Sequence, residues 1–210
     1  MPRSLRIQDA GYVHHVVLRG NDRQVIFKSR EDYLTYLGFL DQARRDYPIR
    51  IYNFALMDNH IHLLVEPVAD GNLSKAMEEA SKAYAKYFNK KYGRVGHVFQ
   101  GRFKSFLIQD DRYFFACSRY IDLNPVKARI VDSPKQFPWS GHNLLAMGGS
   151  SAIVLDYHDA YKELGKSPEE RQVAYRALVV NYQGEDLDLL NRRAGILGDR
   201  EFKKRILGKR

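Results

Sequence analysis

Apolar and polar positions divide the first 110 residues of the chain into strand-like and helix-like segments. The apolar, β-branched segments predict strands, and these lie at 12–19, 49–57, 60–66 and 102–109. Apolar residues at helical spacing predict two helices, over about 30–47 and 73–92. The resulting order is strand, helix, strand, strand, helix, strand. It predicts an α+β fold of the ferredoxin-like (split βαβ) type, in which one antiparallel sheet carries both helices on one face.

Local signals mark where these elements begin and end. Ser29, with Asp32 three residues later, is a capping box for the first helix. Asp58-Asn59 has the composition of a tight turn, which pairs the second strand with the third. Gly93 ends the second helix. The second and third strands therefore form a hairpin.

A further helix is expected after the predicted sheet. It begins at the aspartates 110–111 and keeps its apolar spacing to about residue 123. We expect Asn124-Pro125 to end it, because the residue before proline is disfavoured in the helical conformation. Asn124 would then cap another helix, over 126–131.

Tyrosines recur on one face of this helix. Tyr113 and Tyr120 are seven residues apart and share a face, and Asn124 lies one turn beyond Tyr120. The helix can therefore present a phenol and an amide oxygen to the open face of the sheet. Tyr113 is the weaker candidate for binding a phosphate, because Asp110 and Asp111 lie beside it.

Two histidines open the third predicted strand. Side chains alternate between the faces of a strand, so His60 and His62 project from one face while Ile61 and Leu63 project from the other. Two imidazoles about 7 Å apart along a strand can converge on one metal ion. Such a pair is more often exposed or hydrogen-bonded, so this pattern alone leaves both interpretations open. We expect the pair on the sheet face away from the helices.

Charge adds a candidate partner. The formal net charge is +9, and residues 1–130 carry 21 basic against 14 acidic residues. Residues 80–109 contain seven basic residues, no acidic residue and seven aromatic residues. Basic side chains can neutralise phosphates and aromatic faces can stack bases, as single-stranded nucleic acid requires. For most of these aromatics we favour a place in the hydrophobic core.

Other features limit the class of protein. A single cysteine, Cys117, excludes an internal disulfide and any multi-cysteine zinc site, and we expect it to be packed and inert. The chain lacks an apolar run of about 18 residues and a signal-peptide core. We therefore expect no membrane partner and a cytoplasmic, nucleoid-associated location.

Four motifs together resemble a known family. NHIHLLVEP at 59–67 is followed by GHVFQGRFKS at 96–105 and by RYIDLNPVKARIV at 119–131, with PWS at 138–140. In this order they resemble the REP-associated tyrosine transposases, relatives of the single-tyrosine insertion-sequence transposases among the His-hydrophobic-His endonucleases. The resemblance spans about 12–140. It implies a ferredoxin-like fold and a protein that binds palindromic DNA hairpins as single strands and cleaves beside them.

The resemblance also implies roles for particular residues. Its metal-binding pair matches His60 and His62, its nucleophile matches Tyr120, and Asn124 is a candidate third ligand or only a helix cap. Imidazole ligands favour Zn, Mn or Co, whereas the family implies Mg or Mn, which we predict. Candidate DNA-binding residues are Lys82, Lys86, Lys90, Arg94, Arg102, Lys104, Arg119 and Lys127. The family favours a monomer, although its insertion-sequence relatives are dimers.

The last third of the chain is predicted to be a helical extension. A linker at 147–151 separates a transposase domain, 1–146, from this extension, 151–210. Helices are expected after the capping box Ser167-Pro168-Glu169-Glu170, over 185–193, and after Asp199. Basic residues motivate the hypothesis that the extension grips the hairpin or shields the active site; these are Arg192, Arg193, Lys203, Lys204 and Arg205.

Three other functions compete with a tyrosine transposase. A domesticated hairpin-binding protein would keep the basic surface without the chemistry. A metal-dependent hydrolase would use His60 and His62 to activate water and would not need Tyr120. An RNA-binding sheet would need an aromatic motif that the fourth strand, RFKSFLIQ, lacks. For His15 and His97 we favour a hydrogen-bonded structural role over contact with DNA.

Overall fold

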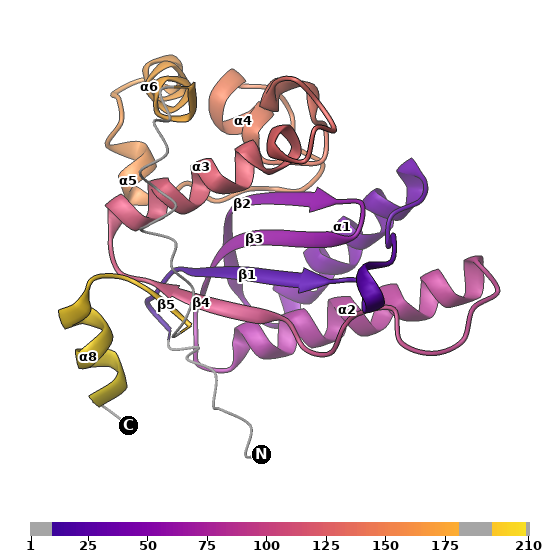
Figure 1. Ribbon diagram of the computed structural model, residues 1–210. Helices are drawn as coiled ribbons and strands as arrows, with labels where there is room; N and C mark the ends of the chain where they lie inside the picture. The colour runs from indigo at the N-terminus through magenta and orange to yellow at the C-terminus, as the bar shows by residue number, and fades with distance from the viewer. Residues whose placement is uncertain (1–9, 181–194, 209–210) are drawn as a thin grey trace.

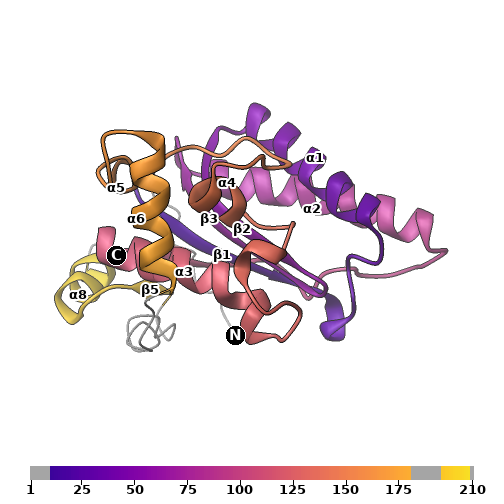
Figure 2. The ribbon, with the colours of Figure 1, turned by 90° about the horizontal axis from the view of Figure 1, so that it is seen from above.

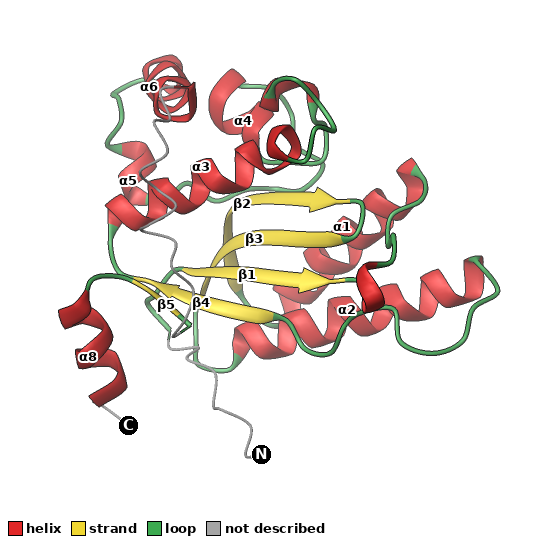
Figure 3. Cartoon of the chain, viewed as in Figure 1, coloured by secondary structure: helices red, strands yellow, loops and turns green. Residues whose placement is uncertain are grey.

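The computed structural model describes residues 10–180 and 195–208 (Figure 3). The strands are β1 (His14–Arg19), β2 (Ile49–Met57), β3 (His60–Pro67), β4 (Lys104–Ile108) and β5 (Ile196–Leu197). The helices are α1 (Arg30–Asp46), α2 (Asn72–Lys91), α3 (Asp111–Lys127), α4 (His142–Met147), α5 (Asp159–Lys162), α6 (Pro168–Val180) and α8 (Arg200–Gly208). Short 3-10 helices lie at η1 (Asn21–Arg23) and η2 (Pro134–Gln136).

The strands form one sheet in the order β2-β3-β1-β4-β5. The first four are antiparallel to their neighbours, as predicted, and β2 and β3 form the expected hairpin, with Met57 opposite His60. Helices α1 and α2 cover one face of the sheet, and α3 lies on the other (Figures 1 and 2). The predicted ferredoxin-like fold is therefore confirmed, with the tyrosine-bearing helix on the open face.

The main hydrophobic core lies between the sheet and the helices α1 and α2. Alternate residues of β3, Ile61, Leu63 and Val65, are fully buried in it. Of the seven aromatics between residues 80 and 109, five are buried: Tyr84, Phe88, Phe99, Phe103 and Phe106. The prediction that most of these aromatics belong to the core is confirmed.

One predicted helix boundary is wrong. Helix α3 continues through Asn124 and Pro125 as far as Lys127. The backbone oxygen of Asn124 accepts the amide of Ala128, so Asn124 lies inside a helix and does not cap one. The helix ends instead at Lys127, and Arg129, two residues later, has a φ of 59°, which is in the left-handed conformation. Pro125 is buried, and its packing outweighs its intrinsic preference against the helix interior.

The carboxy-terminal extension contains helices and one unexpected strand. The capping box at Ser167 is present, because the Glu170 amide donates to the Ser167 hydroxyl. Asp199 begins α8 by accepting the amide of Phe202. Strand β5 was not predicted; it has only two residues and pairs with β4 in parallel. The predicted helix over 185–193, with Arg192 and Arg193, lies outside the described residues.

Helices α4 and α6 pack against each other, and α6 also contacts α3. The two segments separated at 147–151 are thus in contact, and their division into two domains stays a prediction. None of the helices in the described ranges, 10–180 and 195–208, has the length and hydrophobicity needed to span a membrane.

Candidate active site

The alternation of β3 places both histidines on the face that carries α3. Their ring centroids are 4.9 Å apart and the ring planes are nearly perpendicular, at 88°. His62 is only 2% exposed, and His60 is half-buried. The predicted placement of His60 and His62 on the open face, beneath the tyrosine helix, is what the structure has.

Hydrogen bonding from the β2–β3 turn orients the His60 ring. The Asn59 amide nitrogen donates to the backbone oxygen of Arg23 at 3.2 Å, so its amide oxygen is left to accept. That oxygen lies 2.6 Å from Nδ1 of His60, which must therefore carry a hydrogen. In the neutral ring, Nε2 then carries a lone pair.

The Nε2 atom of His60 faces a second hydrogen-bond acceptor, the amide oxygen of Asn124. Nε2 of His60 lies 3.3 Å from Oδ1 of Asn124, one turn after Tyr120 on α3. A neutral imidazole nitrogen and an amide oxygen that face each other suit a cation between them. Within the described residues, no three His, Cys, Asp or Glu side chains form a metal-binding group. A metal here would therefore have two imidazoles and an amide as ligands from the protein.

His15 supports the second histidine. It lies on β1, is fully buried, and its Nε2 is 2.9 Å from Nδ1 of His62. The two rings stack with centroids 5.1 Å apart. The expected hydrogen-bonded role of His15 is thus observed, and its partner is a candidate ligand. An outer hydrogen bond of this kind fixes the tautomer and orientation of a metal-binding imidazole.

Tyr120 completes the cluster from α3. Its ring lies 5.5 Å from the His62 ring and 5.9 Å from the His15 ring, edge-on to both. Its side chain is half-buried, and the Lys127 ammonium lies 5.5 Å from its ring centroid. The residue proposed as nucleophile and the histidine pair therefore occupy one site, although they are about 60 residues apart in sequence.

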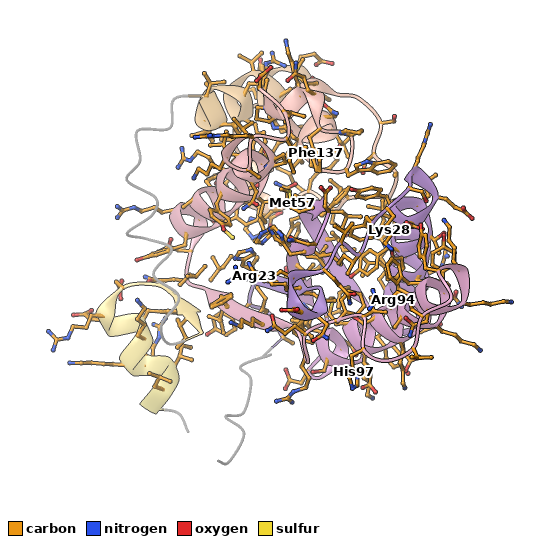
Figure 4. The ribbon with its side chains drawn as sticks, turned by 45° about the vertical axis from the view of Figure 1, so that its right-hand side comes forward. Arg23, Lys28, Met57, Arg94, His97 and Phe137 are labelled. Atoms are coloured by element: carbon orange, nitrogen blue, oxygen red, sulfur yellow. The ribbon has the colours of Figure 1, made fainter. Side chains whose placement is uncertain are left out.

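An open hollow of about 610 Å³ adjoins His60 at the end of the sheet. Its wall includes Arg19, Arg23 and Met57, together with Ile130 beyond the end of α3. Figure 4 brings this end of the sheet forward, with Arg23 and Met57 labelled. Arg19 pairs with His60 across β1 and β3, which places it on the face of the histidines. Sequence reasoning missed both arginines, although the alternation of β1 is a signal for Arg19.

The predicted DNA-binding residues fall into separate groups. Lys104 lies on the site face, because it is opposite Val17 and Val17 is opposite His62. Lys82, Lys86 and Lys90 are exposed on α2, on the opposite face of the sheet.

The remaining candidates have other surroundings. Lys82 forms ion pairs with Glu78 and Glu79. Arg94 contacts Gln24, and exposed Arg102 borders a second hollow, of about 420 Å³, with Lys82. Arg119 donates to the backbone oxygen of Leu178 in α6 at 2.7 Å.

Competing residues are less suited to the chemistry. Burial and the nearby Asp199 and Asp110 carboxylates raise the pKa of Tyr113, which makes its phenolate harder to form. Cys117 is fully buried, as predicted. His97 is exposed in a loop, and its backbone oxygen accepts a hydrogen bond from Gln24.

Comparison with known proteins places the chain in a family. The family model described as transposase, IS200-like, matches residues 10–124, more than half of the chain. The chain belongs to the IS200-like transposase family. The matched span contains the two histidines and Tyr120, so the family inferred from the motifs is confirmed.

Two solved structures are similar to this transposase. A REP-associated tyrosine transposase bound to a REP hairpin is 21% identical over 76% of this chain and 94% of that chain, with a TM-score of 0.59. A putative transposase from Deinococcus radiodurans R1 is 14% identical over 58% of this chain and 96% of that chain, with a TM-score of 0.39. The first likeness confirms the fold. The search of curated proteins gave no significant match.

Proposed function

We propose that this transposase is a metal-dependent single-strand DNA endonuclease of the REP-associated kind, which cleaves and rejoins DNA beside palindromic hairpins through a 5′-phosphotyrosine. The observation that carries the proposal is the meeting of His60, His62 and Tyr120 on one face of the sheet. Family membership supports strand transfer, and the likeness to a hairpin-bound transposase supports the choice of substrate.

The reaction needs only one nucleophile and a phosphodiester. The Tyr120 oxygen attacks phosphorus, a tyrosine–phosphorus bond forms, and the bond from phosphorus to the 3′-oxygen breaks. The phenol loses its proton and the leaving oxygen gains one, so the products are a 5′-phosphotyrosine and a free 3′-hydroxyl. Since one ester replaces another, no ATP is required. Another 3′-hydroxyl can later attack the phosphotyrosine and take the 5′-phosphate from Tyr120, which rejoins the DNA.

The residues present fit a divalent cation, and we propose Mg or Mn. His60 and His62, with Asn124 as the third ligand, would hold it. When bound, a divalent ion polarises a non-bridging phosphate oxygen and neutralises charge that develops at phosphorus. Asn59 and His15 would keep both imidazoles in the tautomer that offers a lone pair.

The charged hollow beside His60 suits the strand that leads into the site. Arg19 and Arg23 can each bind a phosphate, and Lys127 lies against Tyr120. Together with the predicted contact of Lys104, which lies on the same face, these residues would hold the DNA next to the cleaved linkage. We propose that one chain acts by itself on a DNA hairpin.

The test is to incubate the protein and Mn²⁺ with labelled hairpin oligonucleotides taken from palindromes that flank its gene. Protein-linked DNA is then measured on a denaturing gel. Tyr120→Phe is expected to lower adduct formation by at least about 1,000-fold, and His60→Ala/His62→Ala to do the same, while hairpin binding persists. Tyr113→Phe, on the same helix, is the matched control and should retain activity.

The other outcomes identify the competing functions. Tight hairpin binding by the unaltered protein without any adduct would indicate a non-catalytic binder. Cleavage without attachment that persists in Tyr120→Phe would indicate a hydrolase.

A further inference from the structure

The helix that carries Tyr120 is held by a buried polar cluster on its far side from the histidines. The cluster joins five side chains from four elements, each at most 5% exposed: Asn53 of β2, Ser118 and Asp122 of α3, His142 of α4 and Tyr175 of α6. Buried polar groups are costly unless they are hydrogen-bonded. Their hydrogen bonds therefore restrict how these elements can lie against one another.

Asp122 is the centre of the cluster. Its Oδ1 accepts from the Asn53 amide nitrogen at 2.9 Å. Its Oδ2 accepts from the Tyr175 hydroxyl at 2.7 Å and lies 2.9 Å from Nδ1 of His142. Burial raises the pKa of Tyr175 well above its usual value, so this phenol keeps the hydrogen that it donates. Two of the three partners come from α4 and α6.

Ser118 closes the cluster. Since the Tyr175 hydrogen goes to Asp122, the Ser118 hydroxyl, 2.7 Å away, donates to the Tyr175 oxygen. The Asn53 amide nitrogen also lies 2.9 Å from the Ser118 oxygen. Asn53 reaches α3 because β2 is irregular between Ile51 and Asn53, which turns Tyr52 and Asn53 to the same face.

A second contact joins the nucleophile helix to α6. Arg119, next to Tyr120, donates to the backbone oxygen of Leu178. Ser118 and Asp122 lie two residues before and after Tyr120. The contacts of α6 with α3 are thus centred on the turn that carries the nucleophile.

We propose that α6, through Tyr175, positions the tyrosine helix for reaction and is not a DNA-binding element. This role differs from the grip or shield expected of the extension, and it rests on the proposed function. Tyr175 is a positioning residue, since it acts through Asp122 and Ser118 on α3. Its hydroxyl fixes where α3 lies along β2, whereas the apolar contacts beneath α3 lack such direction.

The experiment compares two variants that each remove one buried hydroxyl. Tyr175→Phe removes the hydroxyl that contacts α3. Tyr161→Phe is the matched control, because its hydroxyl is also buried in the extension but donates to the backbone oxygen of Leu145 in α4. Three quantities are measured: amide hydrogen exchange of residues 113–125, the affinity for the hairpin, and the rate constant of adduct formation at saturating hairpin with Mn²⁺.

Tyr175→Phe is expected to speed amide exchange in α3. It should lower the rate constant of adduct formation by about 10- to 100-fold, because small displacements of a reacting group have effects of this size. Hairpin affinity should stay within about twofold of that of the unaltered protein. Tyr161→Phe should change none of the three. Equal effects of both variants on α3 exchange would overturn the proposal. So would a Tyr175→Phe variant that loses hairpin affinity and keeps its rate constant.

A substitute variant and a readout that does not depend on activity complete the experiment. If Tyr175→Phe does not fold, Ser118→Ala takes its place, because it removes one of the two contacts between the Tyr175 hydroxyl and α3 and leaves the contact with Asp122. If the unaltered protein forms no adduct, the proposed function fails, but the exchange comparison still decides whether Tyr175 holds α3.

Discussion

The two faces of the sheet share the same strands but bury different chemistry. On the face of α1 and α2 the strands bury mainly apolar side chains, such as Ile61, Leu63 and Val65, and His14 is the buried polar exception among the described strand residues. Under α3 the same strands bury His15, Asn53 and His62 as well as apolar residues. Apolar burial has no preferred direction, whereas each buried polar group requires a partner at a given distance and angle. The face under α1 and α2 therefore contributes mainly to the stability of the fold, and the face under α3 fixes the positions of the side chains in the candidate site.

Removing a large side chain from the apolar face tests this division most strongly. Phe88 on α2 is fully buried in the main core. Phe88→Ala is expected to lower the free energy of unfolding by about 3–5 kcal/mol, measured by urea denaturation. Adduct formation per folded molecule should be unchanged, since Phe88 lies on the far face from Tyr120. A loss of activity greater than the loss of folded protein would show that the faces are coupled.

Acid should weaken the apolar face through one buried carboxylate. Burial alone would raise the pKa of Asp32, but hydrogen bonds from Lys91, Tyr92 and Tyr87 and from a backbone amide lower it to about 2. The ionised carboxylate therefore stabilises the fold above pH 4, and this contribution is lost as the pH falls through about 2. A pKa lowered from near 4 to about 2 corresponds to about 2 kcal/mol. Denaturation between pH 5 and 2 measures it.

Asp32→Asn is the control for this prediction, because it has no charge to lose. Its unfolding free energy should fall less between pH 5 and 2 than that of the unaltered protein. If the two proteins lose stability in parallel, other carboxylates account for the acid sensitivity.

The smallest effect on stability is expected from the exposed lysines of α2. Lys86→Ala/Lys90→Ala should change the unfolding free energy by less than about 0.5 kcal/mol per residue. If these lysines contact the hairpin, as the sequence predicts, the affinity falls and the slope of log affinity against log salt decreases by about 2. Lys162→Ala, which removes an exposed lysine paired with Asp159 on α5, is the control. Equal slopes in both variants would remove α2 from the DNA interface.

Much of the fold could be predicted from local patterns. The apolar segment at 49–57 predicted β2 over its full length, and the helical spacing of apolar residues predicted α1 to within a residue at either end. The alternation of β3 predicted that His60 and His62 lie together on the face away from α1 and α2. These predictions succeed because a strand or an amphipathic helix has one periodicity, which the core requires.

Other features could not be read from local preference. Proline at position 125 predicts a helix end, yet α3 continues, because tertiary packing exceeds the intrinsic penalty near the end of a helix. Strand β5 has two residues and carries no periodicity of its own. The guanidinium of Arg119 is a group that can bind a phosphate, but in the structure it donates to the backbone oxygen of Leu178 in α6.

The sequence by itself determined which side chains of a strand or helix share a face, and it determined the family of the chain. Both follow from the spacing of residues along the chain. The tertiary structure decided which partners those side chains meet. It joined His15 to His62, and it joined Tyr175 of α6 to Asp122, two residues after Tyr120. The last pair is 53 residues apart. Such contacts depend on how whole elements pack, and no local pattern encodes that arrangement.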